Sequence, residues 1–165
     1  MKLRPVLIAA APLFGLACLT PSPAEAACAP LSLCSCTTTA TGVSFGSYDP
    51  TAGQARTTTG NVHVLCTLLV AIAGSFTIDL STGSSSSYAG RTLRNGASSL
   101  RYNLFTDNTR SQIWGNGTGG SANVSQSFTG LLLIDRTATI YGSIAAGQNV
   151  PAGTYSDTII VTVSY

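Results

Sequence analysis

Apolar and polar residues alternate along much of the chain beyond residue 26, with the period of two that is typical of half-buried β-strands. Strand-like runs recur roughly every eight to twelve residues, and Gly, Ser, Asn and Pro gather between them, which favours a sandwich or a barrel. The sequence therefore predicts an all-β domain. The expected strands cover residues 39–48, 59–72, 75–81, 100–106, 136–144 and 155–165.

The run that ends at Tyr165 has a regular apolar face. Tyr155, Ile159, Val161, Val163 and Tyr165 fall on one side of the expected strand, and Ser and Thr residues fall on the other. A strand with one apolar face needs a neighbour within a sheet or a strand from another molecule. We therefore expect this run either to pair inside the fold or to await a partner strand.

The first 26 residues have the order of a secretory signal peptide. A charged start is followed by an apolar middle from Val6 to Leu19 and by the small-residue exit Ala24-Glu25-Ala26. We expect a signal peptide at 1–26 and a mature domain at 27–165, which would be exported. The later run "VLCTLLVAIAG" is too short to cross a bilayer, so no integral membrane span is expected.

Charge excludes some classes of partner. The only Lys and the only Glu lie within the expected signal peptide, and beyond it six arginines face five aspartates. A nearly neutral surface rich in Ser, Thr, Gly and Asn offers no large field to steer nucleic acid or acidic membranes. We therefore expect no nucleic-acid partner.

The cysteines suit an oxidising compartment. Beyond the expected signal peptide the chain has four of them, an even number suited to two disulfides. Zinc is disfavoured because Cys34 and Cys36 are separated by one residue instead of two to four. The four residues are Cys28, Cys34, Cys36 and Cys66.

Candidate chemistry is sparse. The single histidine, His63, falls on the polar side of a predicted strand, opposite in phase to Val62 and Val64, with no sign of a catalytic partner. The five aspartates are scattered singly, and we expect them to be solvated or to cap turns. We therefore predict no catalytic residue, no cofactor, no metal site and no enzymatic activity. The aspartates are Asp49, Asp79, Asp107, Asp135 and Asp157.

Three separated motifs carry a resemblance that covers nearly all of the expected mature chain. The stretches "CTTTATGVSFGSYDP", "GNVHVLCT" and "YGSIAAGQNVPAGTYSDTIIVTVSY" resemble the spore coat protein U domain family, the subunit domain of archaic chaperone-usher pili. The most specific pieces are the turn from Phe45 to Pro50, the pair Cys66-Thr67, and the approach from Pro151 to Asp157.

The resemblance implies an immunoglobulin-like sandwich that lacks its last strand and is completed by a donor strand from another chain. Main-chain hydrogen bonds and alternate side chains in pockets would hold that strand. The partners implied are a periplasmic pilus chaperone, an outer-membrane usher and other pilus subunits, and the product would pass through the periplasm to a fibre on the cell surface. The donor-strand groove is expected to be lined by Val43, Phe45, Ile159, Val161, Val163 and Tyr165.

Strand phase and the family pattern together suggest a disulfide between Cys36 and Cys66, with Cys28 and Cys34 paired locally. Among the three connectivities that four cysteines allow, a Cys34–Cys66 bridge is the next alternative.

Two functions are compatible with the sequence. The first is a structural subunit of a surface fibre that contributes to adhesion and biofilm formation. The alternative is a stand-alone or tip adhesin, a lectin-like domain that would bind through loops carrying Tyr88 and Trp114, unless Trp114 is instead a buried sandwich residue. The segment 27–36 is short for a strand donor, so the subunit would either donate a short strand or accept without donating.

Overall fold

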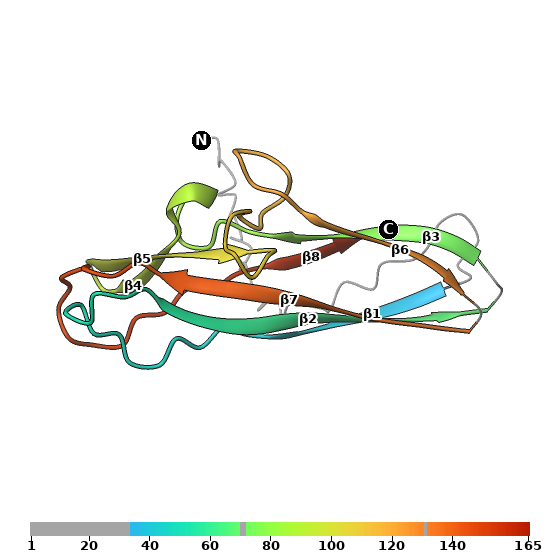
Figure 1. The fold of residues 1–165 in the computed structure, drawn as a ribbon. Helices are drawn as coiled ribbons and strands as arrows, with labels where there is room; N and C mark the ends of the chain where they lie inside the picture. The colour runs from blue at the N-terminus through green and yellow to red at the C-terminus, as the bar shows by residue number, and fades with distance from the viewer. Residues whose placement is uncertain (1–33, 70–71, 131) are drawn as a thin grey trace, which may run out of the picture.

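The computed structural model describes residues 34–69, 72–130 and 132–165, which form an elongated molecule of two stacked β-sheets (Figure 1). The larger sheet has the strand order β1-β2-β7-β5-β4, and the smaller has the order β6-β3-β8, with antiparallel pairing throughout. The expected all-β sandwich is confirmed. The strands are β1 (Cys34–Thr41), β2 (Arg56–Leu68), β3 (Ile72–Leu80), β4 (Thr92–Asn95), β5 (Ser98–Phe105), β6 (Val124–Gly130), β7 (Leu133–Ile144) and β8 (Val161–Ser164), and the 3-10 turn η1 covers Tyr88–Gly90.

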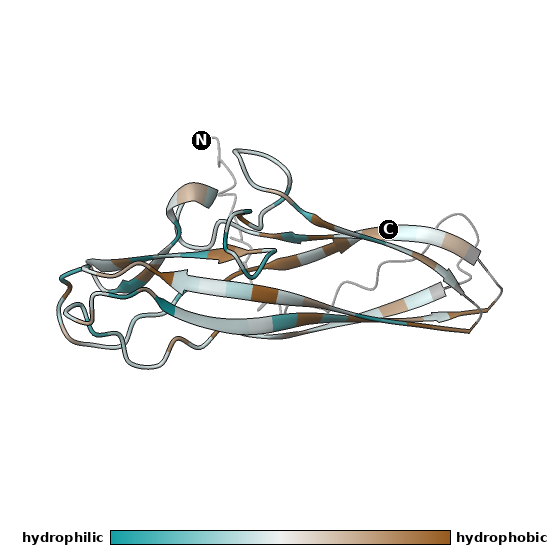
Figure 2. Ribbon diagram, viewed as in Figure 1, coloured by the Kyte–Doolittle hydropathy of each residue, from teal (hydrophilic) through white to brown (hydrophobic). Residues whose placement is uncertain are grey.

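The core lies between the sheets and follows the alternation read from the sequence. Along β2 every second residue from Gly60 to Leu68 is buried, and β7 has the same pattern towards Ile144. Figure 2 shows hydrophobic and hydrophilic residues alternating along these strands. Among the described residues no helix is long and apolar enough to cross a membrane.

A disulfide joins the first two strands. Cys36 lies directly opposite Cys66 in the β1–β2 register, and the two sulfur atoms are bonded. This confirms the expected bridge and excludes the Cys34–Cys66 alternative. The second expected bridge involves Cys28, which lies outside the described residues.

Several predicted strand boundaries are wrong. The first strand begins at Cys34 and ends at Thr41, whereas residues 42–48 leave the sheet edge. The run 59–72 is divided, because β2 ends at Leu68 and β3 begins at Ile72. At the C-terminus only Val161–Ser164 form a strand. Before it, Ile160 bonds to Ser81, just beyond β3, and Ser156 forms an isolated bridge with Arg94 of β4.

The hydrophobic pattern did not predict strands β4 and β6. The β4–β5 hairpin turns at Gly96, which has φ +55°, and the Asn95-Gly96 dipeptide is a known hairpin signal. In β6 the alternate residues Val124, Gln126 and Phe128 face inward, but the central glutamine interrupts the apolar pattern. The alternation of apolar and polar residues was therefore too weak to identify either strand.

The proposed surface-binding role of Trp114 is wrong. Its side chain is completely buried, and its indole Nε1 donates a hydrogen bond of 2.9 Å to the carbonyl oxygen of Ile78. Tyr88 is half-buried, with the guanidinium carbon of Arg91 5.3 Å from its ring centroid. The two loops that carry these aromatic residues therefore fold onto the core, and the buried-tryptophan alternative is confirmed.

Candidate strand-accepting groove

The segment 42–48 crosses the inner face of the larger sheet instead of continuing β1. Two glycines in the underlying strands make this approach possible. A Cβ on Gly60 would lie 2.5 Å from the carbonyl oxygen of Thr41, and one on Gly142 would lie 2.6 Å from Val43 and 2.9 Å from Phe45. Side chains at either glycine would therefore push the crossing segment away from the sheet.

We predict that Gly142→Val displaces the segment 42–48 and lowers the stability of the domain by about 1–3 kcal/mol, the usual effect of overpacking a dense core. Chemical denaturation of the exported protein measures this change. Gly42→Val is a suitable control because nothing lies within 4 Å of the position of its added Cβ. Gly147→Val is a poor control because Gly147 has φ +75°, a backbone conformation that valine rarely adopts. Equal stability of Gly142→Val and Gly42→Val would contradict the packing argument.

The crossing segment is fixed at its middle and at its end. The ring of Phe45 packs edge-on against Tyr102, with centroids 5.9 Å apart, and the Phe45 backbone carbonyl oxygen accepts a 2.7 Å hydrogen bond from Arg56 Nε. The hydroxyl of Tyr48 donates to the carbonyl oxygen of Ala145 at 2.9 Å and accepts from the backbone N–H of Gln148 at 2.9 Å. The segment 42–48 therefore has a defined position on the sheet, and it forms one wall of a groove described below.

A turn follows this wall and contains Asp49 as the sequence suggested. The Asp49 carboxylate accepts hydrogen bonds from the hydroxyl and the backbone N–H of Thr51, and these bonds lower its pKa. Asp107 caps another turn, where hydrogen bonds from Thr109 first, and then from the backbone of Gln112 and Ser111, lower its pKa. These two aspartates are turn-capping residues, as expected.

The C-terminal segment forms the opposite wall and passes from one sheet to the other. Ser156 exchanges two backbone hydrogen bonds with Arg94 at the edge of the larger sheet, at 2.7 and 3.0 Å. Five residues later β8 pairs with β3, with Val161 opposite Leu80 and Val163 opposite Ile78.

Asp157 holds the crossing point between these two pairings. Its Oδ1 accepts hydrogen bonds from the backbone N–H groups of Ser84 and Thr158, at 2.8 and 2.9 Å, and its Oδ2 accepts one from the Tyr102 hydroxyl at 2.7 Å. The pKa of Tyr102 is raised, first by burial and then by this hydrogen bond. Asp157 is therefore a half-buried residue that joins Ser84, Thr158 and Tyr102 by hydrogen bonds, and the expectation that it is merely solvated or caps a turn is wrong.

Arg91 supports the same region and was not identified from the sequence. Its side chain is completely buried and donates to the carbonyl oxygens of Ser81 and Trp114 and to Asn103 Oδ1, at 2.7 to 3.1 Å. Burial lowers the pKa of its guanidinium, although arginine remains charged at physiological pH. No periodicity distinguishes a buried arginine from an exposed one, so only its place in the fold reveals its role.

A groove of about 810 Å³ lies between the two walls. Its lining includes the apolar side chains of Leu93, Leu100 and Ile144 from the larger sheet. Of the residues predicted for it, Val43 and Phe45 line this groove. The other four continue along the C-terminal segment, where they are half-buried against the core: Ile159, Val161, Val163 and Tyr165.

Among the described residues, β1 and β8 each have one side that no neighbouring strand covers. β8 is an edge strand of the smaller sheet and pairs only with β3 there. On β1, Thr38 and Ala40 are exposed although their register partners Val64 and Val62 are completely buried. Within the described residues the inner side of β1 is thus exposed in part, and β8 has one edge without a partner strand.

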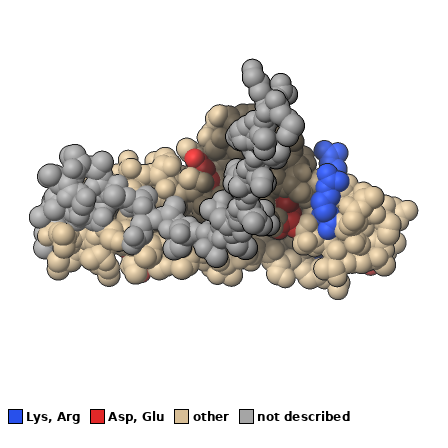
Figure 3. Space-filling view, turned by 180° about the vertical axis from the view of Figure 1, so that it is seen from behind, with Lys and Arg blue, Asp and Glu red and all other residues tan. Residues whose placement is uncertain are grey.

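Other chemistry is limited in the described part of the chain. His63 Nε2 lies 2.8 Å from Asp135 Oδ1, in a partly exposed pair across β2 and β7. Within residues 34–69, 72–130 and 132–165 no group of three or more His, Cys, Asp or Glu side chains could hold a metal. Figure 3 shows charged side chains that are few and scattered over the visible described surface.

Comparisons with known proteins agree with the resemblance seen in the sequence. The family model of the spore coat protein U domain matches residues 24–162. Protein U of Myxococcus xanthus is 37% identical over 164 residues, which cover 87% of this chain and 89% of that protein.

A solved structure supports the sandwich fold. It is a chain from the chaperone–tip adhesion subunit pre-assembly complex of the archaic chaperone-usher Csu pili of Acinetobacter baumannii, similar with a TM-score of 0.54 and 19% identity. The match covers 81% of this chain but only 40% of that one.

Proposed function

The chain belongs to the spore coat protein U domain family, and from this premise we propose that it is a structural subunit of an exported surface fibre. Each subunit would be completed by a strand from another protein, first a periplasmic chaperone and then a neighbouring subunit. An outer-membrane usher would pass the growing fibre to the cell surface, where it would contribute to adhesion and biofilm formation. This role requires no catalysis and no cofactor.

The observation that carries the proposal is the groove between the segment 42–48 and the C-terminal segment. The groove is lined by the segment that follows β1 and by the segment that leads to β8. In addition, β8 is an edge strand and the inner side of β1 is exposed. An added strand would form main-chain hydrogen bonds with the free edge of β8 and place alternate side chains over the apolar lining.

The energetics favour such an addition. Burying one aliphatic side chain contributes roughly 1.5–3 kcal/mol, so three or four side chains of a donor strand would supply a large part of the net stability of a domain this size. The half-buried residues Ile159, Val161 and Val163 would become fully buried at the same time. The donor strand therefore acts as a missing part of the core.

Export with and without a cognate chaperone tests this function. We expect the chain to accumulate in the periplasm as a one-to-one complex when the chaperone is produced, and to be degraded or to aggregate when it is not. Equal amounts of soluble, monomeric protein under both conditions would contradict donor-strand assembly and would favour a self-sufficient secreted domain.

A further inference from the structure

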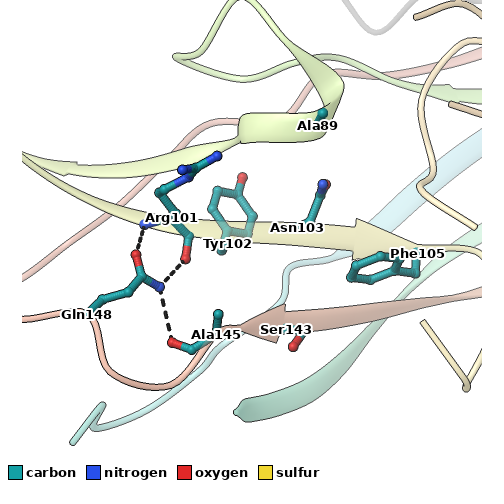
Figure 4. Close-up of a pocket in the computed structure, with 8 residues that line it drawn as sticks. All are labelled: Ala89, Arg101, Tyr102, Asn103, Phe105, Ser143, Ala145 and Gln148. Atoms are coloured by element: carbon teal, nitrogen blue, oxygen red, sulfur yellow. Dashed lines mark hydrogen bonds between the residues drawn. The ribbon is translucent and has the colours of Figure 1, made fainter. Parts of the chain in front are cut away.

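A second cavity, of about 430 Å³, lies away from the groove, beside the C-terminal ends of β5 and β7 and the turn η1 (Figure 4). It is lined along β5 by Arg101, Asn103 and Phe105, and along the neighbouring strand β7 by Ser143. In the register Asn103 faces Ser143, and Phe105 faces Tyr141. This volume falls in the range of small-ligand sites, which combine apolar lining with a few polar groups.

Gln148 closes one end of the cavity and fixes its shape. Its side-chain amide accepts a 2.8 Å hydrogen bond from the backbone N–H of Arg101 and donates to the carbonyl oxygens of Arg101 and Ala145, at 2.8 and 3.1 Å (Figure 4). Both amide hydrogens are therefore used, and the Gln148 side chain is a structural support with no free donor.

The remaining polar groups of the cavity are mainly donors. The Arg101 side chain is exposed and has no ion-pair partner within the described part of the chain. Its guanidinium lies beside the turn η1, where a Cβ added to Gly90 would be 3.7 Å from Arg101 Nη2. Asn103 Nδ2 uses one hydrogen on the carbonyl oxygen of Tyr88 and retains a second. Ser143 offers a hydroxyl, and no carboxylate lines the cavity.

We propose that this cavity binds a carboxylated sugar unit of an acidic polysaccharide. The Arg101 guanidinium pairs with the sugar carboxylate, a geometry for which arginine is well suited. The half-buried ring of Phe105 provides an apolar platform for the sugar ring, and Asn103 and Ser143 bond to its hydroxyls. This goes beyond fibre assembly, because it gives each subunit a ligand of its own at a site separate from the groove.

Calorimetric titration of the exported protein with a tetrasaccharide of hexuronate tests the proposal, with maltotetraose as an uncharged probe of the same length. We expect the uronate to bind and maltotetraose to bind at least tenfold more weakly. Arg101→Gln should reduce the affinity for the uronate by about tenfold or more, the effect of losing one charge-assisted pair. Phe105→Ala should reduce it as well.

Arg136→Gln is the matched control, since it removes the same charge from an exposed position on β7. It should change the affinity by less than about twofold, as expected for an exposed charge outside the site. Three results would overturn the proposal: no uronate binding, equal binding of both sugars, or equal losses in the two arginine variants. The amount of exported Arg101→Gln should match the wild type, which separates sugar binding from fibre assembly.

Discussion

Val161→Asp should abolish chaperone capture and reduce the amount of exported protein by more than about tenfold. Val161 is half-buried on the apolar side of β8, opposite Leu80 in the register. An arriving donor strand would bury the new carboxylate without a partner, which costs several kcal/mol, whereas a tenfold loss needs only about 1.4 kcal/mol. Quantitative blotting of periplasmic and surface fractions measures the effect.

The matched control for this variant is Ser164→Asp, on the exposed side of the same strand and opposite Thr77. Thr162 is less suitable because it faces Asp79, so a new carboxylate there would add like-charge repulsion. We expect Ser164→Asp to be exported nearly normally. Similar export of both variants would show that the apolar side of β8 does not receive a strand.

Removal of the disulfide should have the second large effect. Cys36→Ala together with Cys66→Ala opens a loop with a sequence separation of 30 residues. The loop-entropy model assigns about 3–4 kcal/mol to such a bridge, which corresponds to a decrease in Tm of roughly 10 °C for a domain of this length. Differential scanning calorimetry of the exported protein bound to its chaperone measures this decrease.

Reduction of the wild-type protein with dithiothreitol provides the comparison for that double variant. Reduced wild type and the double variant should unfold at similar temperatures, since both lack the same cross-link. An unchanged Tm in the double variant would mean that β1 is held to β2 by its ladder alone.

Much of the fold could be predicted because alternation records which side of a strand faces the core. The phase of Val161 and Val163 and the pairing of Cys36 with Cys66 follow from this period of two together with the family pattern. β4 was missed because its four residues are too few to display the period.

The tertiary features of the site could not be predicted in the same way. The crossing of residues 42–48 depends on Gly60 and Gly142, which are distant in sequence and become neighbours of Val43 only in the folded sheet. Similarly, Arg91 and Asp157 resemble ordinary surface residues in the sequence, and each bonds to a residue of β5 that is distant from it in sequence, Asn103 and Tyr102 respectively. Of the six residues predicted for the groove, the structure places Val43 and Phe45 in its lining, and the hydrophobic pattern did not predict the polar network beside them.

Thermal unfolding of residues 27–165, produced without any partner, tests the strand-accepting account most directly. Circular dichroism and light scattering would be recorded together during heating. The account predicts a domain that aggregates or melts without a cooperative transition, because part of its core must come from another chain. A monomer with a cooperative transition above about 65 °C, the upper range for mesophilic domains, would show that the sandwich is complete by itself and would contradict the account.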